Sequence, residues 1–198
     1  VSRHVLSVLQ WASKSTHTNL LEGKDKTALD VGCAYGYTSK ILCSLGYETY
    51  GVDISAWGTK QAKQCCSSQF LVCDAQSTFP FIADKFDVVT CFDVLEHLPN
   101  PETALLSMFE SSKSIIIATT PNKTVEKPIR KLMRDYDETH VSAKSQADWK
   151  KTISNNLSCS HLQVDAFYDF AVRFGKKLFY KSVNIPHYGL TVRIAIKK

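Results

Sequence analysis

Glycines and a carboxylate are concentrated in the segment Leu29–Gly36, which reads LDVGCAYG. Gly32 and Gly36 allow the backbone to turn tightly and to approach a ligand closely, and the amides of a following helix then face that ligand. The negative charge of Asp30 disfavours a pyrophosphate and favours a ligand that carries an ammonium group. The segment therefore predicts a binding loop for a cationic ligand without phosphate.

Two histidines are candidates for proton transfer, because histidine titrates near neutral pH. His97 follows a strongly apolar run and lies beside Asp93 and Glu96, whereas His140 stands in the segment DETHVS. Two less specific interpretations stay open: Glu96 and His97 orient a loop, and His140 is an exposed loop residue. The three neighbours 93, 96 and 97 suit a divalent metal, but such clusters are common without one, so we expect no metal site.

The elements that must position these residues alternate along the chain. Apolar runs predict five strands, at residues 28–31, 49–54, 69–73, 86–92 and 114–119. Helical spacing and capping residues predict helices at residues 37–45, 55–67 and 101–109. This order is typical of βαβ units in a parallel sheet, whose ligands bind at the carboxyl ends of the strands.

The last third of the chain has a different pattern. Residues 144–155 predict a helix, and residues 162–170 and 190–196 alternate like strands that pair antiparallel. The aromatic and basic segment 167–180 is interpreted as strand core followed by a basic turn, rather than as a platform for stacked bases. We expect an α/β fold with a doubly wound, mostly parallel seven-stranded sheet and an antiparallel C-terminal strand.

Length and composition set further bounds. The chain has 198 residues, a formal net charge of +5 and seven cysteines without a C-x-x-C pair, which disfavours structural zinc and fits a reducing compartment. No apolar run reaches the length of a membrane span, and the first residues do not read as a signal peptide. We expect a single domain over residues 1–198 and a cytoplasmic location.

The segment LDVGCAYG resembles motif I of the class I, Rossmann-like methyltransferases, written Asp-x-Gly-x-Gly-x-Gly. Asp30, Gly32 and Gly36 match, and Ala34 replaces the middle glycine. The segments FDVLEHLPNP (92–101), TTPNK (119–123) and ETHVSAKS (138–145) are similar to the small-molecule methyltransferases of the ubiquinone-biosynthesis type. The resemblance covers roughly residues 27–150.

The resemblance implies that S-adenosylmethionine is the cofactor. Asp53, which ends the second predicted strand, would bind the ribose hydroxyls, and Asp74 with Ala75 would lie near the adenine. The cofactor-binding residues it implies are Asp30, Gly32, Ala34, Gly36, Asp53, Ile54, Asp74, Ala75 and Phe92. Residues 1–26 would form an N-terminal helix or lid, and residues 121–145 the variable substrate cap.

We therefore expect methyl transfer to an oxygen or carbon of a small molecule, with His97 or His140 as the base. The positive net charge is compatible with an anionic acceptor. An RNA or protein methyltransferase is an alternative, because basic residues recur in the run 123–134 (Lys123, Lys127, Arg130, Lys131 and Arg134). Another alternative is a non-catalytic methyltransferase-like binding protein, which Ala34 suggests. The oligomeric state cannot be predicted.

Overall fold

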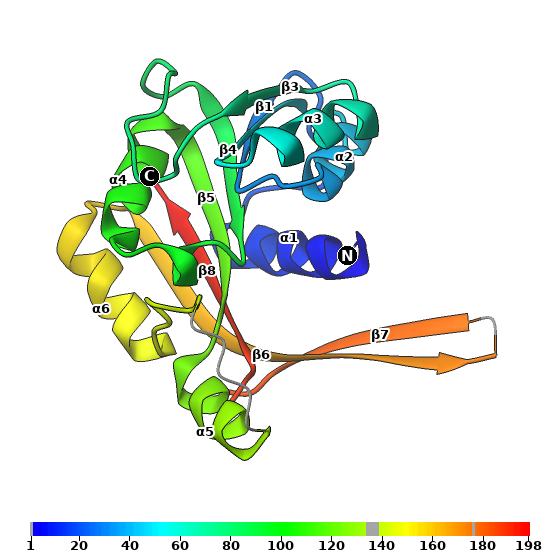
Figure 1. The fold of residues 1–198 in the computed structure, drawn as a ribbon, viewed down its shortest axis with the longest axis vertical. Coiled ribbons are helices and arrows are strands. Elements are labelled where there is room, and N and C mark those ends of the chain that lie inside the picture. Colours follow the sequence, from blue (N-terminus) through cyan, green and yellow to red (C-terminus); the bar gives the residue numbers. More distant parts are fainter. Residues whose placement is uncertain (1, 134–138, 176) are drawn as a thin grey trace.

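A single eight-stranded sheet runs through the molecule in the order β3-β2-β1-β4-β5-β8-β6-β7 (Figure 1). This computed structural model describes residues 2–133, 139–175 and 177–198. The strands are β1 (Thr27–Val31), β2 (Glu48–Asp53), β3 (Gln69–Val72), β4 (Phe86–Phe92), β5 (Ser112–Pro121), β6 (His161–Phe174), β7 (Lys177–Asn184) and β8 (Thr191–Lys197). Strands β1 to β5 are parallel, and β8 runs antiparallel to both β5 and β6.

Helices cover both faces of the sheet, as expected for a doubly wound fold. The helices are α1 (Ser2–Thr16), α2 (Tyr37–Ser44), α3 (Ala56–Cys65), α4 (Pro101–Ser111), α5 (Lys123–Met133) and α6 (Gln146–Asn156), with a 3₁₀ turn η1 (Leu95–His97). Helices α1, α2 and α3 lie on one face, and α4 and α6 lie on the other (Figure 1). Within the described residues, no helix is long and apolar enough to cross a membrane.

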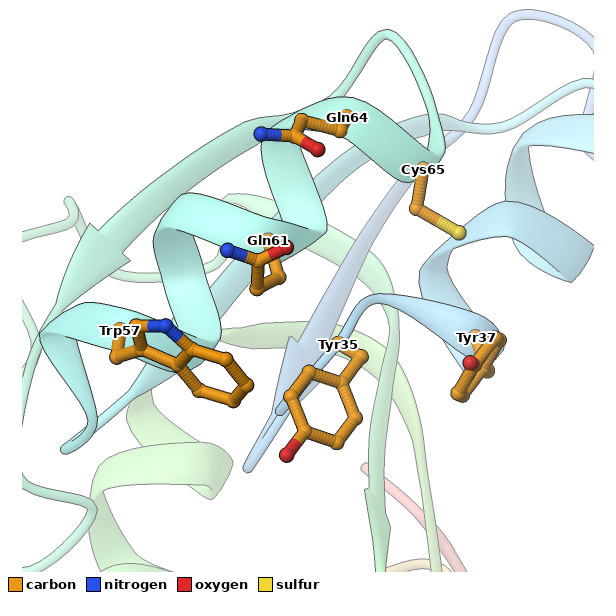
Figure 2. A pocket seen from close by; sticks show the side chains of 6 residues that line it. All are labelled: Tyr35, Tyr37, Trp57, Gln61, Gln64 and Cys65. Atoms are coloured by element: carbon orange, nitrogen blue, oxygen red, sulfur yellow. The ribbon is translucent and has the colours of Figure 1, made fainter.

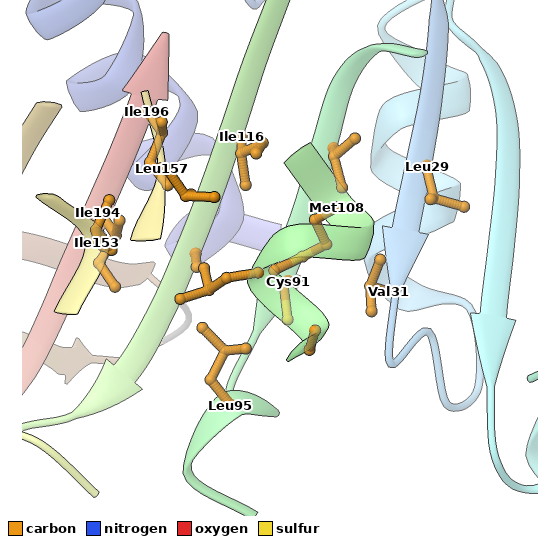
Figure 3. Packing of buried hydrophobic residues seen from close by; sticks show 14 of the residues in the cluster. Leu29, Val31, Cys91, Leu95, Met108, Ile116, Ile153, Leu157, Ile194 and Ile196 are labelled. Carbon is orange, nitrogen blue, oxygen red and sulfur yellow. The ribbon is translucent and has the colours of Figure 1, made fainter. Parts of the chain in front are cut away.

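The core consists of two apolar layers, because successive side chains of a strand point to opposite faces of the sheet. Ile116 of β5 packs with Ile153 of α6 and Ile194 of β8 in one layer (Figure 3). Ile115 and Ile117, also on β5, pack in the other layer against α1 and α2. Strands buried on both faces explain the almost continuous apolar runs in the sequence.

The predicted strand count of seven is wrong, since the sheet has eight strands. The predicted pairing of residues 162–170 with 190–196 is confirmed as β6 against β8. The additional strand is β7, which pairs antiparallel with β6 after a turn at Gly175, where φ is +58°. This hairpin projects beyond the rest of the molecule as an arm (Figure 1). The sequence of β7 does not alternate between polar and apolar residues, so the sequence alone favours a basic turn there.

A buried polar network attaches the arm to the body. The guanidinium of Arg193 on β8, which is 1% exposed, donates to Asp169 Oδ1 at 2.6 Å. Burial alone would raise the pKa of Asp169, but hydrogen bonds from His4, Ser182 and Tyr180 and the charge of Arg193 hold it well below its usual range. Helix α1 is thereby joined to both strands of the arm.

A second buried carboxylate fixes the start of α2. Asp30 is 2% exposed and accepts hydrogen bonds from the hydroxyls of Ser39 on α2 at 2.6 Å and Thr90 on β4 at 3.1 Å. Burial raises the pKa of Asp30 from 3.8 to about 6, against the lowering effect of these two hydroxyls. The carboxylate therefore holds β1, β4 and α2 together beneath the glycine loop.

This burial predicts a pH-dependent stability. Between pH 3.8 and about 6 the native protein keeps the Asp30 proton that the unfolded chain loses, so the free energy of unfolding falls as pH rises through this window. The loss at neutral pH is about 3 kcal/mol at most. Urea denaturation from pH 4 to 7 should show a flatter profile for Asp30→Asn than for the wild type. The exposed Asp25→Asn serves as control, and parallel profiles for the wild type and Asp30→Asn would contradict the assignment.

Candidate functional site

The glycine loop follows β1 at the carboxyl edge of the sheet, and three of its residues have left-handed backbone angles. The φ angles are +73° at Gly32, +43° at Ala34 and +76° at Gly36. A Cβ on Gly32 would lie 2.2 Å from a methyl carbon of Val94, so this glycine is also required by its contact with the segment after β4. The loop is thus shaped by backbone conformation and by close packing on its own chain.

Asp53 at the end of β2 anchors the loop. One carboxylate oxygen accepts from the backbone amide of Ala34 and the other from that of Ser55, both at 2.8 Å. A carboxylate has about four acceptor positions, so two stay available for hydroxyl groups of a ligand. The neighbouring Ile54 is 71% exposed and offers an apolar surface beside this carboxylate.

A cavity of about 440 Å³ opens against the loop. Its lining comprises His4, Val5, Gly32, Cys33, Ala34, Tyr35, Tyr37, Thr38, Phe92 and Asp93. Asp93 has a left-handed φ of +55°, and the Thr119 hydroxyl donates to its Oδ1 at 2.9 Å. The cavity therefore combines backbone amides with a positioned carboxylate, a donor set that suits a ligand with an ammonium group.

The residues proposed for cofactor binding fall into two groups. Gly32, Ala34 and Phe92 line the cavity, whereas the carboxylate of Asp30 is buried behind it. Asp74 and Ala75 follow β3 outside the cavity lining, and Asp74 accepts from the backbone amide of Gln76 at 2.9 Å. Sequence reasoning missed the lining residues His4 and Val5 of α1, for which the sequence contains no motif, and considered Asp93 only as a metal ligand.

The two candidate bases, found in separate segments, lie together. The ring centroids of His97 and His140 are 4.7 Å apart with the rings nearly perpendicular. His97 Nδ1 lies 3.1 Å from the carbonyl oxygen of Thr139, so its proton sits on Nδ1 and Nε2 is left as an acceptor. His140 Nδ1 contacts Glu126 Oε1 of α5. A carboxylate that holds one imidazole nitrogen directs the other nitrogen to act as a base.

Glu96 completes this group. It is 1% exposed, and burial raises its pKa from 4.5 to about 8, so the carboxyl is largely protonated at neutral pH. Its Oε2 has no hydrogen-bond partner among the described residues. One ligand atom from each of Glu96, His97 and His140 lies within 4.8 Å of the others, a donor set that first-row transition metals accept. That no metal binds here stays a prediction.

The conformation of Ala34 leads to a stability prediction. A left-handed φ costs an L-residue about 1–2 kcal/mol, so Ala34→Gly should raise the free energy of unfolding by about 1 kcal/mol. Urea denaturation measures the change. In the matched control, Ala56→Gly at the start of α3 should lower stability by up to about 1 kcal/mol. A destabilised Ala34→Gly variant would show that the alanine methyl contributes more through packing than it costs in strain.

Relatives by sequence match part of the chain, including the glycine loop. Residues 29–114 match the methyltransferase domain family. The ubiquinone biosynthesis O-methyltransferase of Glaesserella parasuis is 34% identical over 134 residues, which cover 62% of this chain and 56% of that protein. The enzyme of the same name from Methylococcus capsulatus is 30% identical, with coverages of 62% and 54%. This chain thus spans little more than half the length of these relatives.

Solved structures match the whole chain in fold. A SAM-dependent methyltransferase from Archaeoglobus fulgidus superposes with a TM-score of 0.71 at 20% identity, covering 100% of this chain and 95% of that one. The magnesium protoporphyrin IX methyltransferase of Synechocystis PCC 6803, solved with bound SAH, gives a TM-score of 0.68 at 20% identity, with coverages of 100% and 83%. Residues 29–114 are therefore similar to the methyltransferase domain family, and the chain has the overall fold of the Rossmann-like methyltransferases.

Proposed function

We propose that this protein transfers a methyl group from S-adenosylmethionine to an oxygen of a small-molecule acceptor, with a carbon as the second option. The observation that carries the proposal is the glycine loop, anchored by Asp53 at the carboxyl edge of the sheet and open to the 440 Å³ cavity. The match to the methyltransferase domain family supports the reaction type. The names of the O-methyltransferase relatives favour oxygen.

The residues present fit this cofactor. Asp93 in the cavity wall suits the ammonium group, and the two open acceptor positions of Asp53 suit the ribose hydroxyls. Ile54, together with the segment at Asp74 and Ala75, would border the adenine. The bound cofactor supplies an electrophilic methyl group on a sulfonium, for which the protein provides alignment and a base.

His140 is the favoured base and His97 its neighbour. Glu126 contacts Nδ1 of His140 and orients the ring, and we assign to Nε2 the role of taking the proton of an acceptor hydroxyl as the methyl group arrives. His97 is tied to the carbonyl of Thr139, the residue before His140, and so helps to place it. Both histidines lie on segments that follow parallel strands, where α/β folds bind their ligands.

The proposal includes a negative charge on the methyl acceptor. Lys127 and Lys131 are exposed on α5, the helix that also carries Glu126. A carboxylate or phosphate of the acceptor would be attracted to these lysines. The basic run 123–134 also motivates the alternative of an RNA or protein methyltransferase, but the names of the relatives, which refer to ubiquinone biosynthesis, do not favour it. Arg134 of this run lies outside the described residues.

The alternative of a non-catalytic binding protein loses its main support. Ala34 adopts the left-handed conformation that the middle position of the loop requires, and its amide donates to Asp53.

Because His4 and Val5 of α1 line the cavity, a lid role for residues 1–26 belongs to the proposal. The proposal also includes a substrate-cap role for residues 121–145 and a cytoplasmic location of the protein.

Cofactor binding is tested by calorimetry with S-adenosylmethionine. Asp53→Ala should weaken binding by about 1–3 kcal/mol, because charge-assisted hydrogen bonds to the ribose are lost. Asp25→Ala, an exposed carboxylate away from the cavity, should leave the affinity unchanged. A folded wild-type protein that shows no binding heat would refute the proposed function, and unchanged affinity in Asp53→Ala would refute the role of Asp53.

The base is tested by transfer of radiolabelled methyl groups to a panel of phenols and hydroxylated aromatic acids. His140→Gln should lower kcat by about 10²–10⁴-fold, the usual contribution of general base catalysis, with cofactor affinity retained. Glu126→Gln should lower kcat less than His140→Gln does, since an amide still contacts the imidazole but orients it less firmly than a carboxylate. His187→Gln, on an exposed residue, is the control. Wild-type turnover in His140→Gln would exclude His140 as the base.

A further inference from the structure

A second cleft lies between α2 and α3, on the outer side of the glycine loop (Figure 2). Its volume is about 310 Å³. The lining residues are Tyr35, Tyr37, Trp57, Gln61, Gln64 and Cys65. Tyr35 and Tyr37 also line the larger cavity, so the two hollows share a wall of aromatic side chains. None of the proposed chemistry uses this second cleft.

Three aromatic rings are unusually open to solvent at this cleft. Tyr35 is 43% exposed, Tyr37 56% and Trp57 61%. The Tyr35 ring lies 5.3 Å from the Trp57 ring and 6.3 Å from the Tyr37 ring, both in T-shaped geometry, so neither pair is stacked face to face. Tyr35 lies in the glycine loop between Ala34 and Gly36. The cleft thus offers exposed aromatic surface on which a flat ring can stack.

Two side-chain amides line the cleft on the same helix as Trp57. Gln61 and Gln64 follow Trp57 by four and seven residues, which places all three on one face of α3 (Figure 2). In the part of the chain that the structure describes, neither side-chain amide has a hydrogen-bond partner. A glutamine amide presents a donor and an acceptor side by side, the pattern that matches the edge of a nucleobase.

The surroundings of the cleft are positively charged. Lys40 lies one helical turn after Tyr37, and Lys60 one turn after Trp57, and both are exposed. Neither α2 nor α3 contains an acidic residue. A phosphate held at the rim would therefore meet cations without competition from acidic side chains on either helix.

We propose that this cleft is a nucleotide-binding site. The base stacks on Trp57 and Tyr35, the amides of Gln61 and Gln64 bind the edge of the base, and Lys40 and Lys60 bind its phosphate. The nucleotide comes either from a free nucleoside phosphate or from a single-stranded RNA, which offer the same base and phosphate. This site is independent of methyl transfer, and it would exist whether or not the cavity beside it binds the proposed cofactor.

The intrinsic fluorescence of Trp57 provides a direct test. Of the three tryptophans, Trp149 is fully buried and Trp11 is hydrogen-bonded to Asp165, whereas Trp57 is 61% exposed. Uridine 5′-monophosphate and an oligo(U) strand are suitable probes, because uracil differs from the adenine of the proposed cofactor. Stacking should quench Trp57 in the 198-residue chain. No quenching by either probe at millimolar concentrations would overturn the proposal.

Variants locate the binding and identify its source. Calorimetry should show that Trp57→Ala weakens uridine monophosphate binding about tenfold or more, whereas Tyr188→Ala, an exposed aromatic elsewhere, has no effect. Trp57→Ala should keep its affinity for S-adenosylmethionine, so failure of this site and failure of the proposed function are distinguishable. Unchanged nucleotide affinity in Trp57→Ala would overturn the proposal.

Salt dependence separates the two sources. The site is assigned to single-stranded RNA if oligo(U) binds more tightly than the mononucleotide. The slope of the logarithm of the binding constant against the logarithm of the salt concentration should then fall by about one for each of Lys40→Gln and Lys60→Gln. Equal affinities assign it to a free nucleotide. As a further control, 4-hydroxybenzoate carries an aromatic ring and a negative charge but no base edge. If it binds as tightly as uridine monophosphate, recognition by the glutamines is refuted.

Discussion

The carboxylate of Asp53 holds together the part of the molecule on which both hollows depend. By accepting from the amides of Ala34 and Ser55, it joins the glycine loop to the end of β2 and to the start of α3. Ser55 also caps α3 by accepting from the amide of Gly58. One carboxylate therefore contacts both the loop that lines the cavity and the segment that begins α3, which forms one wall of the cleft.

The sequence predicts those features that depend on neighbours along the chain. Apolar runs located β1 to β5, and the acids and glycines that end them located the loop and Asp53, because parallel strands end at one edge of the sheet. The contact of His97 with His140 was not predictable, because the two residues are far apart in the sequence and meet only through tertiary contacts between η1 and Thr139–His140. Strand β7 was not predictable for a similar reason. Its residues do not alternate between polar and apolar, and the strand forms because it pairs with β6.

Asp30 shows why a correct motif can still mislead about mechanism. Its place in the motif suggests a charge that faces the ligand, yet the structure surrounds it with hydroxyls of Ser39 and Thr90 and excludes it from the cavity lining. Burial raises the pKa of the Asp30 carboxyl and disfavours its charged form. Its hydrogen bonds are better suited to connecting β1, β4 and α2. The exposed negative charge of the cavity comes from Asp93 instead.

Glu126 connects the proposed substrate cap with the proposed base. It lies on α5 and contacts His140, so in the proposed mechanism the base is oriented only when α5 and His140 are both in place. An anionic acceptor drawn to the exposed lysines of α5 would favour the arrangement in which Glu126 contacts His140. A ligand shifts an equilibrium between two conformations only when it binds one of them more tightly than the other. The charge of the acceptor and the orientation of His140 would therefore be coupled in a single binding step.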